Sequence, residues 1–179
     1  KKVIPNGKNL GINITYVEQD KPIGLPDAFI LGEKFIKKDN VALILGDNFF
    51  YGQNLSEKLK QLTTLKKGAT ILLHKVKKPE NYGVAKLDKN NQISKLVEKP
   101  KKFFSDLAVT GLYYFDNKVV KLSKKLRPSK RGEIEIIDLI NEYKKLGELN
   151  GDLIGRGAAW LDTGTIDDFY KTSAFVEAI

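Results

Sequence analysis

Two aspartates follow short apolar runs and have the chemistry to hold one divalent cation. Asp47 follows the run 41–45, and Asp162 follows the run 158–161. A short apolar run bounded by turn-forming residues is typical of a strand buried on both faces, as in a parallel sheet. Ligands of open α/β sheets bind beyond the carboxyl ends of the strands, and Mg²⁺ takes oxygens from one or two carboxylates plus phosphates. The alternative is structural: Asp47 caps a turn, and Asp162 merely precedes a helix.

Five further residues could contact a phosphorylated sugar. Lys99 and Glu98 end a predicted strand, where the lysine could neutralise a phosphate and the glutamate could accept sugar hydroxyls. At Tyr82-Gly83 a ligand could approach bare backbone closely. Arg131 precedes a predicted helix and could reach a phosphate from that side. Simpler interpretations remain open: Glu98 and Lys99 could form an exposed ion pair, and Arg131 could be an exposed residue of a lysine-rich loop.

The composition fits a soluble globular protein. Of the 179 residues, 41% are hydrophobic and 30% are charged. No apolar segment is long enough to span a bilayer and no signal-peptide pattern is present, so we expect no membrane partner and a cytoplasmic location. Cysteine is absent, which excludes disulfides and thiolate metal sites. The single histidine, His74, lies in an apolar run and is expected to be structural and buried or half-buried.

Lysines dominate the charge of the chain, whose formal net charge is +9. They are scattered along predicted helices and loops, and no basic and aromatic residues alternate as on a single-strand-binding face. We therefore expect no nucleic-acid partner and a mostly solvated basic surface that assists the approach of polyanionic substrates. The few arginines are Arg127, Arg131 and Arg156.

Hydrophobic periodicity predicts one α/β domain over residues 1–179. A strand at 12–17, a helix at 25–36 and the strand at 41–45 form a strand–helix–strand unit, whose crossover implies a parallel pair. Thr165 and Asp168 have the spacing of a capping box and start a final helix. The other predicted helices are 54–66, 118–126 and 133–146, and the other predicted strands are 69–76, 82–87, 92–98, 107–115, 149–154 and 158–162.

An ordered set of motifs, spread over nearly the whole chain, resembles the sugar-1-phosphate nucleotidyltransferases, and among them the glucose-1-phosphate thymidylyltransferases. Each motif alone is modest evidence, but their order along the chain is specific. The motifs are Gln19-x-x-Pro22-x-Gly24-Leu25, Leu45-Gly46-Asp47-Asn48-x-x-Tyr51-Gly52, Tyr82-Gly83-Val84, Glu98-Lys99-Pro100, Val109-Thr110-Gly111-Leu112-Tyr113, Arg131-Gly132-Glu133 and Trp160-Leu161-Asp162-Thr163-Gly164-Thr165.

The resemblance implies a Rossmann-like fold, with a mostly parallel sheet flanked by helices and a small antiparallel insertion. It also implies that an oxygen of glucose 1-phosphate attacks the α-phosphorus of dTTP, or of UTP, and releases pyrophosphate in a Mg²⁺-dependent reaction. The full-length form would be a homo-oligomer. These expectations concern the family, and the residues above are where this chain matches it.

The resemblance also assigns roles to individual residues. Gln19 would read the pyrimidine edge beside the backbone of Gly24, and the two aspartates would hold Mg²⁺ against the nucleotide phosphates. The residues that would line the glucose site are Tyr82, Gly83, Glu98 and Val109, and those that would neutralise the sugar phosphate are Lys99 and Arg131.

Two departures from the family pattern qualify the expected activity. The family's N-terminal strand and its Gly-rich nucleotide loop have no counterpart here, and the segment after residue 179 is also missing. We therefore expect a domain truncated at both ends that turns over little or not at all by itself. An alternative is a non-catalytic module that binds the sugar phosphate. A smaller departure is Pro26-Asp27, where the family more often has small or amide residues.

Overall fold

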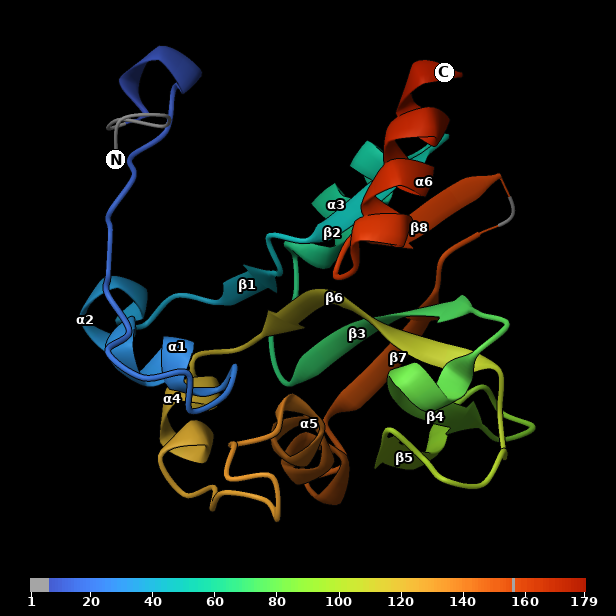
Figure 1. The fold of residues 1–179 in the computed structure, drawn as a ribbon. Helices are drawn as coiled ribbons and strands as arrows, with labels where there is room; N and C mark the ends of the chain where they lie inside the picture. The colour runs from blue at the N-terminus through green and yellow to red at the C-terminus, as the bar shows by residue number, and fades with distance from the viewer. Residues whose placement is uncertain (1–6, 156) are drawn as a thin grey trace.

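The computed structural model describes residues 7–155 and 157–179 (Figure 1). Arg156, one of the arginines noted above, lies outside the described residues. Among the described residues, no helix is long and apolar enough to cross a membrane.

Within residues 7–155 and 157–179, eight strands form two sheets. A six-stranded sheet has the order β5-β4-β6-β3-β7, with β1 also paired to β6, and β2 and β8 form a separate two-stranded sheet. The strands are β1 (Val41–Ile44), β2 (Asn48–Gly52), β3 (Ala69–Lys75), β4 (Gly83–Leu87), β5 (Ile93–Glu98), β6 (Leu107–Phe115), β7 (Leu149–Leu153) and β8 (Ala158–Asp162).

Helices cover both faces of the larger sheet (Figure 1). The 3₁₀ turns are η1 (Lys8–Leu10) and η2 (Pro79–Asn81), and the α-helices are α1 (Asp27–Leu31), α2 (Glu33–Ile36), α3 (Leu55–Leu62), α4 (Lys118–Ser123), α5 (Ile136–Lys145) and α6 (Ile166–Glu177). The predicted helix start at Thr165 is confirmed, because its hydroxyl accepts from the Asp168 N–H at 3.1 Å; the Asp168 carboxylate accepts from the same hydroxyl at 2.7 Å, where a full capping box would use the Thr165 backbone N–H.

Strand β6 is the centre of the larger sheet. All nine of its residues are buried. It pairs with β3 along one edge, while β1 and β4 share its other edge. Alternate residues of a strand face opposite sides of a sheet. Tyr113 and Phe115 accordingly belong to the cluster on one face, and Leu112 and Tyr114 to the cluster on the other.

The α/β class and the sheet flanked by helices are confirmed, but the mostly parallel sheet is wrong. In the described residues only β3 and β7 pair in parallel, and the other five pairings are antiparallel. The prediction of strand–helix–strand units assumed that two strands joined by a helix lie side by side in the sheet. Instead, the long buried strand β6 inserts between β1 and β3 and runs antiparallel to both.

The first predicted crossover unit is also wrong. Residues 12–17 are mostly exposed and form no strand in the described chain, and the predicted helix 25–36 is divided at Gly32 into α1 and α2. Strand β1 is not buried on both faces, since its residues alternate between half-buried and exposed, and Ile44 is 59% exposed. Strand β2 was not predicted at all.

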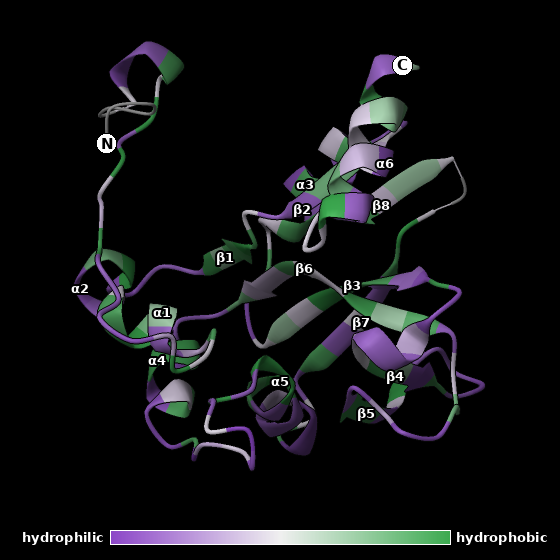
Figure 2. Ribbon diagram, in the orientation of Figure 1, coloured by the Kyte–Doolittle hydropathy of each residue, from purple (hydrophilic) through white to green (hydrophobic). Residues whose placement is uncertain are grey.

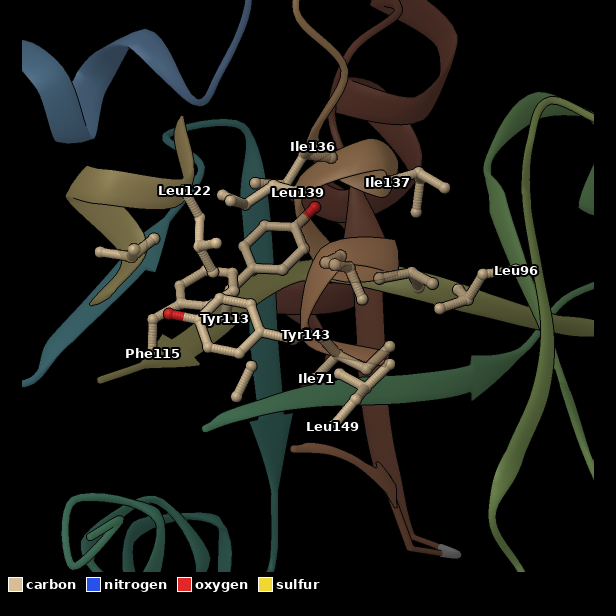
Figure 3. Packing of buried hydrophobic residues seen from close by; sticks show 14 of the residues in the cluster. Ile71, Leu96, Tyr113, Phe115, Leu122, Ile136, Ile137, Leu139, Tyr143 and Leu149 are labelled. Atoms are coloured by element: carbon tan, nitrogen blue, oxygen red, sulfur yellow. The ribbon is translucent and has the colours of Figure 1, made fainter. Parts of the chain in front are cut away.

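The main core fills the space between one face of the larger sheet and the helices α1, α4 and α5 (Figure 3). Helix α5 turns its hydrophobic side toward the sheet and its hydrophilic side away (Figure 2). Phe115 lies 5.3 Å from the ring of Phe29 and 5.4 Å from the ring of Tyr143. Full burial of one large apolar side chain contributes about 1.5–3 kcal/mol, so this aromatic group anchors the helices to the sheet.

A buried carboxylate links four elements at the end of β6. Asp116 is 5% exposed and accepts a hydrogen bond from the N–H of Gly68, just before β3, at 2.8 Å. It also accepts from the hydroxyl of Tyr143 on α5 at 2.8 Å and from the N–H of Lys118, at the start of α4, at 3.1 Å. Burial, followed by this hydrogen bond, raises the pKa of the Tyr143 hydroxyl. The carboxylate therefore satisfies buried donors that no solvent can reach.

Replacement of Asp116 should destabilise the fold strongly. Asp116→Ala leaves the buried Gly68 N–H without its carboxylate acceptor and leaves the Tyr143 hydroxyl with only the backbone carbonyl of residue 116 at 3.4 Å, so we expect the free energy of unfolding to fall by about 2–5 kcal/mol. Urea unfolding followed by far-UV circular dichroism measures the change. The control is Asp106→Ala, which removes only an exposed pair with Lys75 at 3.8 Å and should cost less than about 1 kcal/mol. Equal losses in the two variants would contradict the assignment.

Candidate functional site

The pairing of β2 with β8 places Asp47 beside Asp162. Asn48 lies opposite Asp162 in the antiparallel register. Just beyond this pair, the backbone N–H and the hydroxyl of Thr163 both donate to the carbonyl oxygen of Asp47, at 2.8 Å each. The two predicted aspartates, which are distant in sequence, therefore lie at the same end of the small sheet.

The two carboxylates flank Gly164. Its N–H donates to Asp162 Oδ1 at 3.0 Å, and a Cβ placed on it would lie 3.2 Å from Asp162 Oδ1 and 3.9 Å from Asp47 Oδ2. Burial, followed by repulsion from Asp47 and Asp168, raises the pKa of Asp162, although the Gly164 N–H and Lys99 act in the opposite direction. Two like charges held together in this way favour a cation between or beside them.

Asn48 holds Asp47 and two other parts of the site in place. Its Nδ2 donates to Asp47 Oδ1 at 2.8 Å, and its Oδ1 accepts from the Gly111 N–H at 2.9 Å and from Trp160 Nε1 at 2.5 Å. Since both groups at Oδ1 are donors only, the orientation of the amide is fixed. The bond to Asp47 Oδ1 leaves Oδ2 on the side of Gly164.

A pocket of about 150 Å³ opens next to this pair, between the larger sheet, the start of α5 and β8. Its lining includes five of the residues that the sequence singled out, and it also includes residues that had been given no role. The first group is Tyr82, Gly83, Glu98, Val109 and Asp162, and the second includes Leu25, Asn48, Gly111 and Trp160.

Aromatic contacts form one wall of the pocket. The rings of Tyr82 and Trp160, which both line the pocket, lie 5.2 Å apart, and the ring of His74 lies 6.1 Å from that of Trp160. Burial lowers the pKa of His74, and the prediction that this histidine is at least half-buried is confirmed. Burial, followed by the charges of Asp162 and Asp168, raises the pKa of the Tyr82 hydroxyl.

Gly83 lies directly opposite Glu98 where β4 pairs with β5. A Cβ at this position would lie 2.5 Å from Cδ1 of Ile137 on α5 and 3.3 Å from Glu98 Oε2. The glycine is thus required by helix packing as well as by the room that it leaves in the pocket.

Two basic residues, Arg131 and Lys99, act on the half-buried Glu98. Arg131 lies 3.7 Å from its carboxylate and also pairs with Glu133 at 3.8 Å and Glu135 at 3.6 Å. Burial, followed by repulsion from Glu135, raises the pKa of Glu98, while Lys99 and Arg131 lower it. These acidic partners hold the guanidinium at the Glu98 side of the pocket.

Lys99 follows β5 in a strained backbone conformation. Its φ is 41°, in the left-handed region that a long side chain rarely adopts, and its N–H donates to the carbonyl of Tyr82 at 3.0 Å. The side chain is exposed, and its charge acts on both Glu98 and Asp162. The positive charge of Lys99 therefore acts both on the pocket, through Glu98, and on the aspartate pair, through Asp162.

The structure does not join Gln19 and Gly24 directly to the aspartate pair. Gln19 is exposed and donates from Nε2 to Asp27 Oδ2 at 2.7 Å. Gly24 has φ 119° and packs against the backbone of Ile134, where a Cβ would lie 2.1 Å from the carbonyl oxygen. The residue of this segment that lines the pocket is Leu25, which directly follows Gly24.

The family model of the nucleotidyl transferases matches residues 1–179, so the chain belongs to this family. It is 46% identical, over its whole length, to a glucose-1-phosphate thymidylyltransferase of Neisseria meningitidis and 40% identical to one of Mycolicibacterium smegmatis. It covers 62% of the length of each of these curated relatives.

Solved structures agree with this assignment of the fold. A Bacillus anthracis protein assigned as a glucose-1-phosphate thymidylyltransferase and crystallised with sucrose has a TM-score of 0.89 at 37% identity, covering 99% of this chain and 71% of that one. A UDP-glucose pyrophosphorylase in complex with UDP-glucose has a TM-score of 0.80 at 25% identity, covering 92% of this chain and 66% of that one.

Sequence reasoning missed the supporting residues of the site. Asn48, Gly111 and Trp160 stand in the motifs that carried the resemblance, but nothing in their spacing showed that they bond to one another. Asp27 was noted only as a departure from the family. The signal for all four was present in the sequence, and only the fold shows what each contacts.

Gly111→Ala should disrupt the hydrogen bonds that Asn48 makes with Gly111 and Trp160. A Cβ there would lie 2.5 Å from Asn48 Oδ1, so we expect a loss of about 1–3 kcal/mol of unfolding free energy. The chain has one tryptophan, so its single indole N–H resonance reports directly on the bond from Trp160 to Asn48 and should shift. Gly155→Ala is the control, because a Cβ at Gly155 meets nothing within 4 Å. An unmoved indole resonance in Gly111→Ala would show that Asn48 is not displaced.

Glu98→Gln should change the pH dependence of stability. Because the folded pKa of Glu98 is raised, the wild-type protein carries a penalty that is absent below the ordinary glutamate pKa and grows as the pH rises through the raised value. The Gln variant should therefore gain stability relative to wild type as the pH is raised from about 4 to 8. Urea unfolding at both pH values measures this gain. Glu133→Gln also removes a pair with Arg131, and an equal gain in that variant would assign the effect to Arg131 instead.

Proposed function

We propose that the complete protein transfers a thymidylyl group from dTTP to glucose 1-phosphate, giving dTDP-glucose and pyrophosphate. An oxygen of the sugar phosphate forms a bond to the α-phosphorus of the nucleotide, and the bond from this phosphorus to the β-phosphate oxygen breaks. The observation that carries the proposal is the convergence of Asp47 and Asp162 beside the pocket lined by Tyr82, Gly83 and Glu98. The names of the relatives support the same reaction.

Mg²⁺ is the metal that this site fits. Its donor atoms are carboxylate oxygens of Asp47 and Asp162 on either side of Gly164, and Mg²⁺ is typically bound by one or two carboxylates together with substrate phosphates. The described residues contain no group of three or more acidic, histidine or cysteine ligands, so phosphates and water would complete the shell. When bound, the metal would supply positive charge to the phosphates of the nucleotide.

The protein's own groups would position the two anionic substrates. The sugar would lie in the pocket, where Glu98 would accept hydrogen bonds from its hydroxyls and Val109 would contact the apolar surface of the ring. Lys99 and Arg131 would neutralise its phosphate, because the charges of both act on Glu98, which lines the pocket. Positioning and charge neutralisation together are the main requirements of phosphoryl chemistry between two repelling anions.

UTP is the alternative nucleotide. The fold is shared with a UDP-glucose pyrophosphorylase, and thymine differs from uracil by one methyl group. A methyl contact is worth about 1–3 kcal/mol, so the choice between the two nucleotides rests on a small difference in packing. Gln19 would pair with the edge that both bases share.

The proposed function is tested by pyrophosphate release from the complete protein with dTTP, glucose 1-phosphate and Mg²⁺. We expect Asp47→Asn to lower kcat by about 100-fold or more, because one charged oxygen ligand is lost at the phosphates, while the fold is kept. Asp39→Asn, at an exposed position after α2, is the matched control and should leave kcat near the wild-type value.

Two outcomes would contradict the proposal. Near-normal kcat of Asp47→Asn at saturating Mg²⁺ would remove the metal role of Asp47. Binding of glucose 1-phosphate by the wild-type protein, with no pyrophosphate released from either dTTP or UTP, would favour a non-catalytic module instead.

A further inference from the structure

A groove of about 600 Å³ lies between residues 125–127, which follow α4, and the outer side of α5. This volume is in the range of small-molecule sites, which is roughly 300–1,000 Å³. The groove shares no lining residue with the pocket beside the aspartate pair, although the start of α5 borders that pocket as well. It is therefore a second, separate place where a small molecule could be held.

The first wall of the groove is a short segment that is anchored by one apolar side chain. Leu126 packs against the main core, while its neighbours Lys125 and Arg127 are exposed and line the groove. Pro128 restricts the backbone of Arg127 to extended conformations. The stretch 118–131 contains seven basic residues and no acidic one, so no acidic neighbour in this segment neutralises the two cations.

The second wall is the hydrophilic side of α5 (Figure 2). Asp138, Asn141 and Lys145 lie on the same side of the helix, because residues three and four positions apart are neighbours on a helix surface. Glu142 belongs to this side as well and pairs with Lys145 at 2.5 Å, so its negative charge is balanced within the helix. Lys144, in the last turn, completes the wall.

Positive charge predominates in the groove. Its lining contains four basic and two acidic side chains. Within residues 7–155 and 157–179, Lys125, Arg127 and Lys144 form no ion pair, whereas Glu142 is already paired. A concave surface with an excess of one charge focuses its field and raises the local concentration of ions of the opposite charge. An anion is therefore the ligand that the groove favours.

Asp138 and Asn141 add a second preference. Burial, followed by repulsion from Glu135, raises the pKa of Asp138, while Lys145 acts in the opposite direction. A carboxylate in such surroundings is stabilised by hydrogen bonds that hydroxyl groups donate to it. The amide of Asn141 can both donate and accept. The groove thus combines cations that suit a phosphate with polar groups that suit hydroxyls.

We propose that this groove binds a sugar phosphate, that is, a phosphate ester of a small molecule with several hydroxyl groups. Arg127 and Lys144, from the two walls, would hold the phosphate, since a guanidinium matches two phosphate oxygens and a lysine supplies a point charge. Asp138 would accept hydrogen bonds from the hydroxyls. The site is separate from the pocket of the proposed function and does not depend on the transfer reaction.

Hydrogen–deuterium exchange of the complete protein, titrated with ribose 5-phosphate in the absence of Mg²⁺ and nucleotide, locates the binding. We expect slower exchange in residues 125–127 and 138–145, and the concentration that gives half of this effect measures the affinity of the groove. Exchange at 81–83, which line the other pocket, is followed separately. Protection at 81–83 alone would overturn the proposal.

Lys144→Gln should raise the half-effect concentration about five-fold or more, because a charged contact to the phosphate is lost. Arg127→Gln should have a similar effect and replaces the first variant should that one not fold. The matched control is Lys121→Gln, which removes the same charge from an exposed position of α4 outside the groove and should leave the concentration near wild type. An equal effect of Lys121→Gln would indicate only a general attraction of anions to a basic protein and would overturn the site.

Asp138→Ala tests the recognition of hydroxyls. The measured quantity is the ratio of the half-effect concentrations of inorganic phosphate and ribose 5-phosphate, whose similar charges respond alike to the lost carboxylate. The wild-type protein should prefer ribose 5-phosphate, and the variant should lose about five-fold or more of this preference. A ratio that Asp138→Ala leaves unchanged, or no protection of the groove by either compound, would overturn the proposal.

Discussion

The antiparallel pairing of β2 with β8 is the interaction on which the candidate site depends. These two short strands lie far apart in the sequence and outside the larger sheet, and their register alone brings Asp47 to Asp162. Pairing of distant segments costs loop-closure entropy, so it must be stabilised by side-chain contacts. Those contacts are present: Trp160 of β8 bonds to Asn48 of β2, and the rings of Phe49 and Tyr51 pack against Phe175 of α6.

Strand β6 connects this small sheet to the rest of the molecule. Gly111 in its middle donates to Asn48, Val109 near its start lines the pocket, and Asp116 directly after it satisfies donors from three neighbouring elements. Because β6 is buried along its whole length, each of these groups has little freedom to move. The strand that organises the core therefore also sets the position of the pocket and of the aspartate pair.

The sequence singled out several residues that the fold brings together, but it predicted less of the topology, for a physical reason. Strong local signals, such as the apolar run of β6 and the capping box at Thr165, predicted elements that the structure contains. Pairing partners are not local, so the parallel crossover through 12–17 and 41–45 was wrong and β2 was missed. The convergence of Asp47 and Asp162 could be proposed because both end apolar runs. The bonds of Asn48 could not, because they join residues from three separate strands.

The carboxylates of Glu98 and Asp162 lie in surroundings that disfavour their negative charge. Burial penalises the carboxylates of Glu98 and Asp162, and each also lies near another acidic residue. Such an arrangement costs stability in the absence of a compensating charge, and proteins keep it where it serves binding or chemistry. Lys99 offsets part of the cost at both residues, and it does so from a backbone conformation that is itself strained. Strain and unfavourable charge therefore occur at adjoining positions, where the cation and phosphates of the proposed function would supply the compensating interactions.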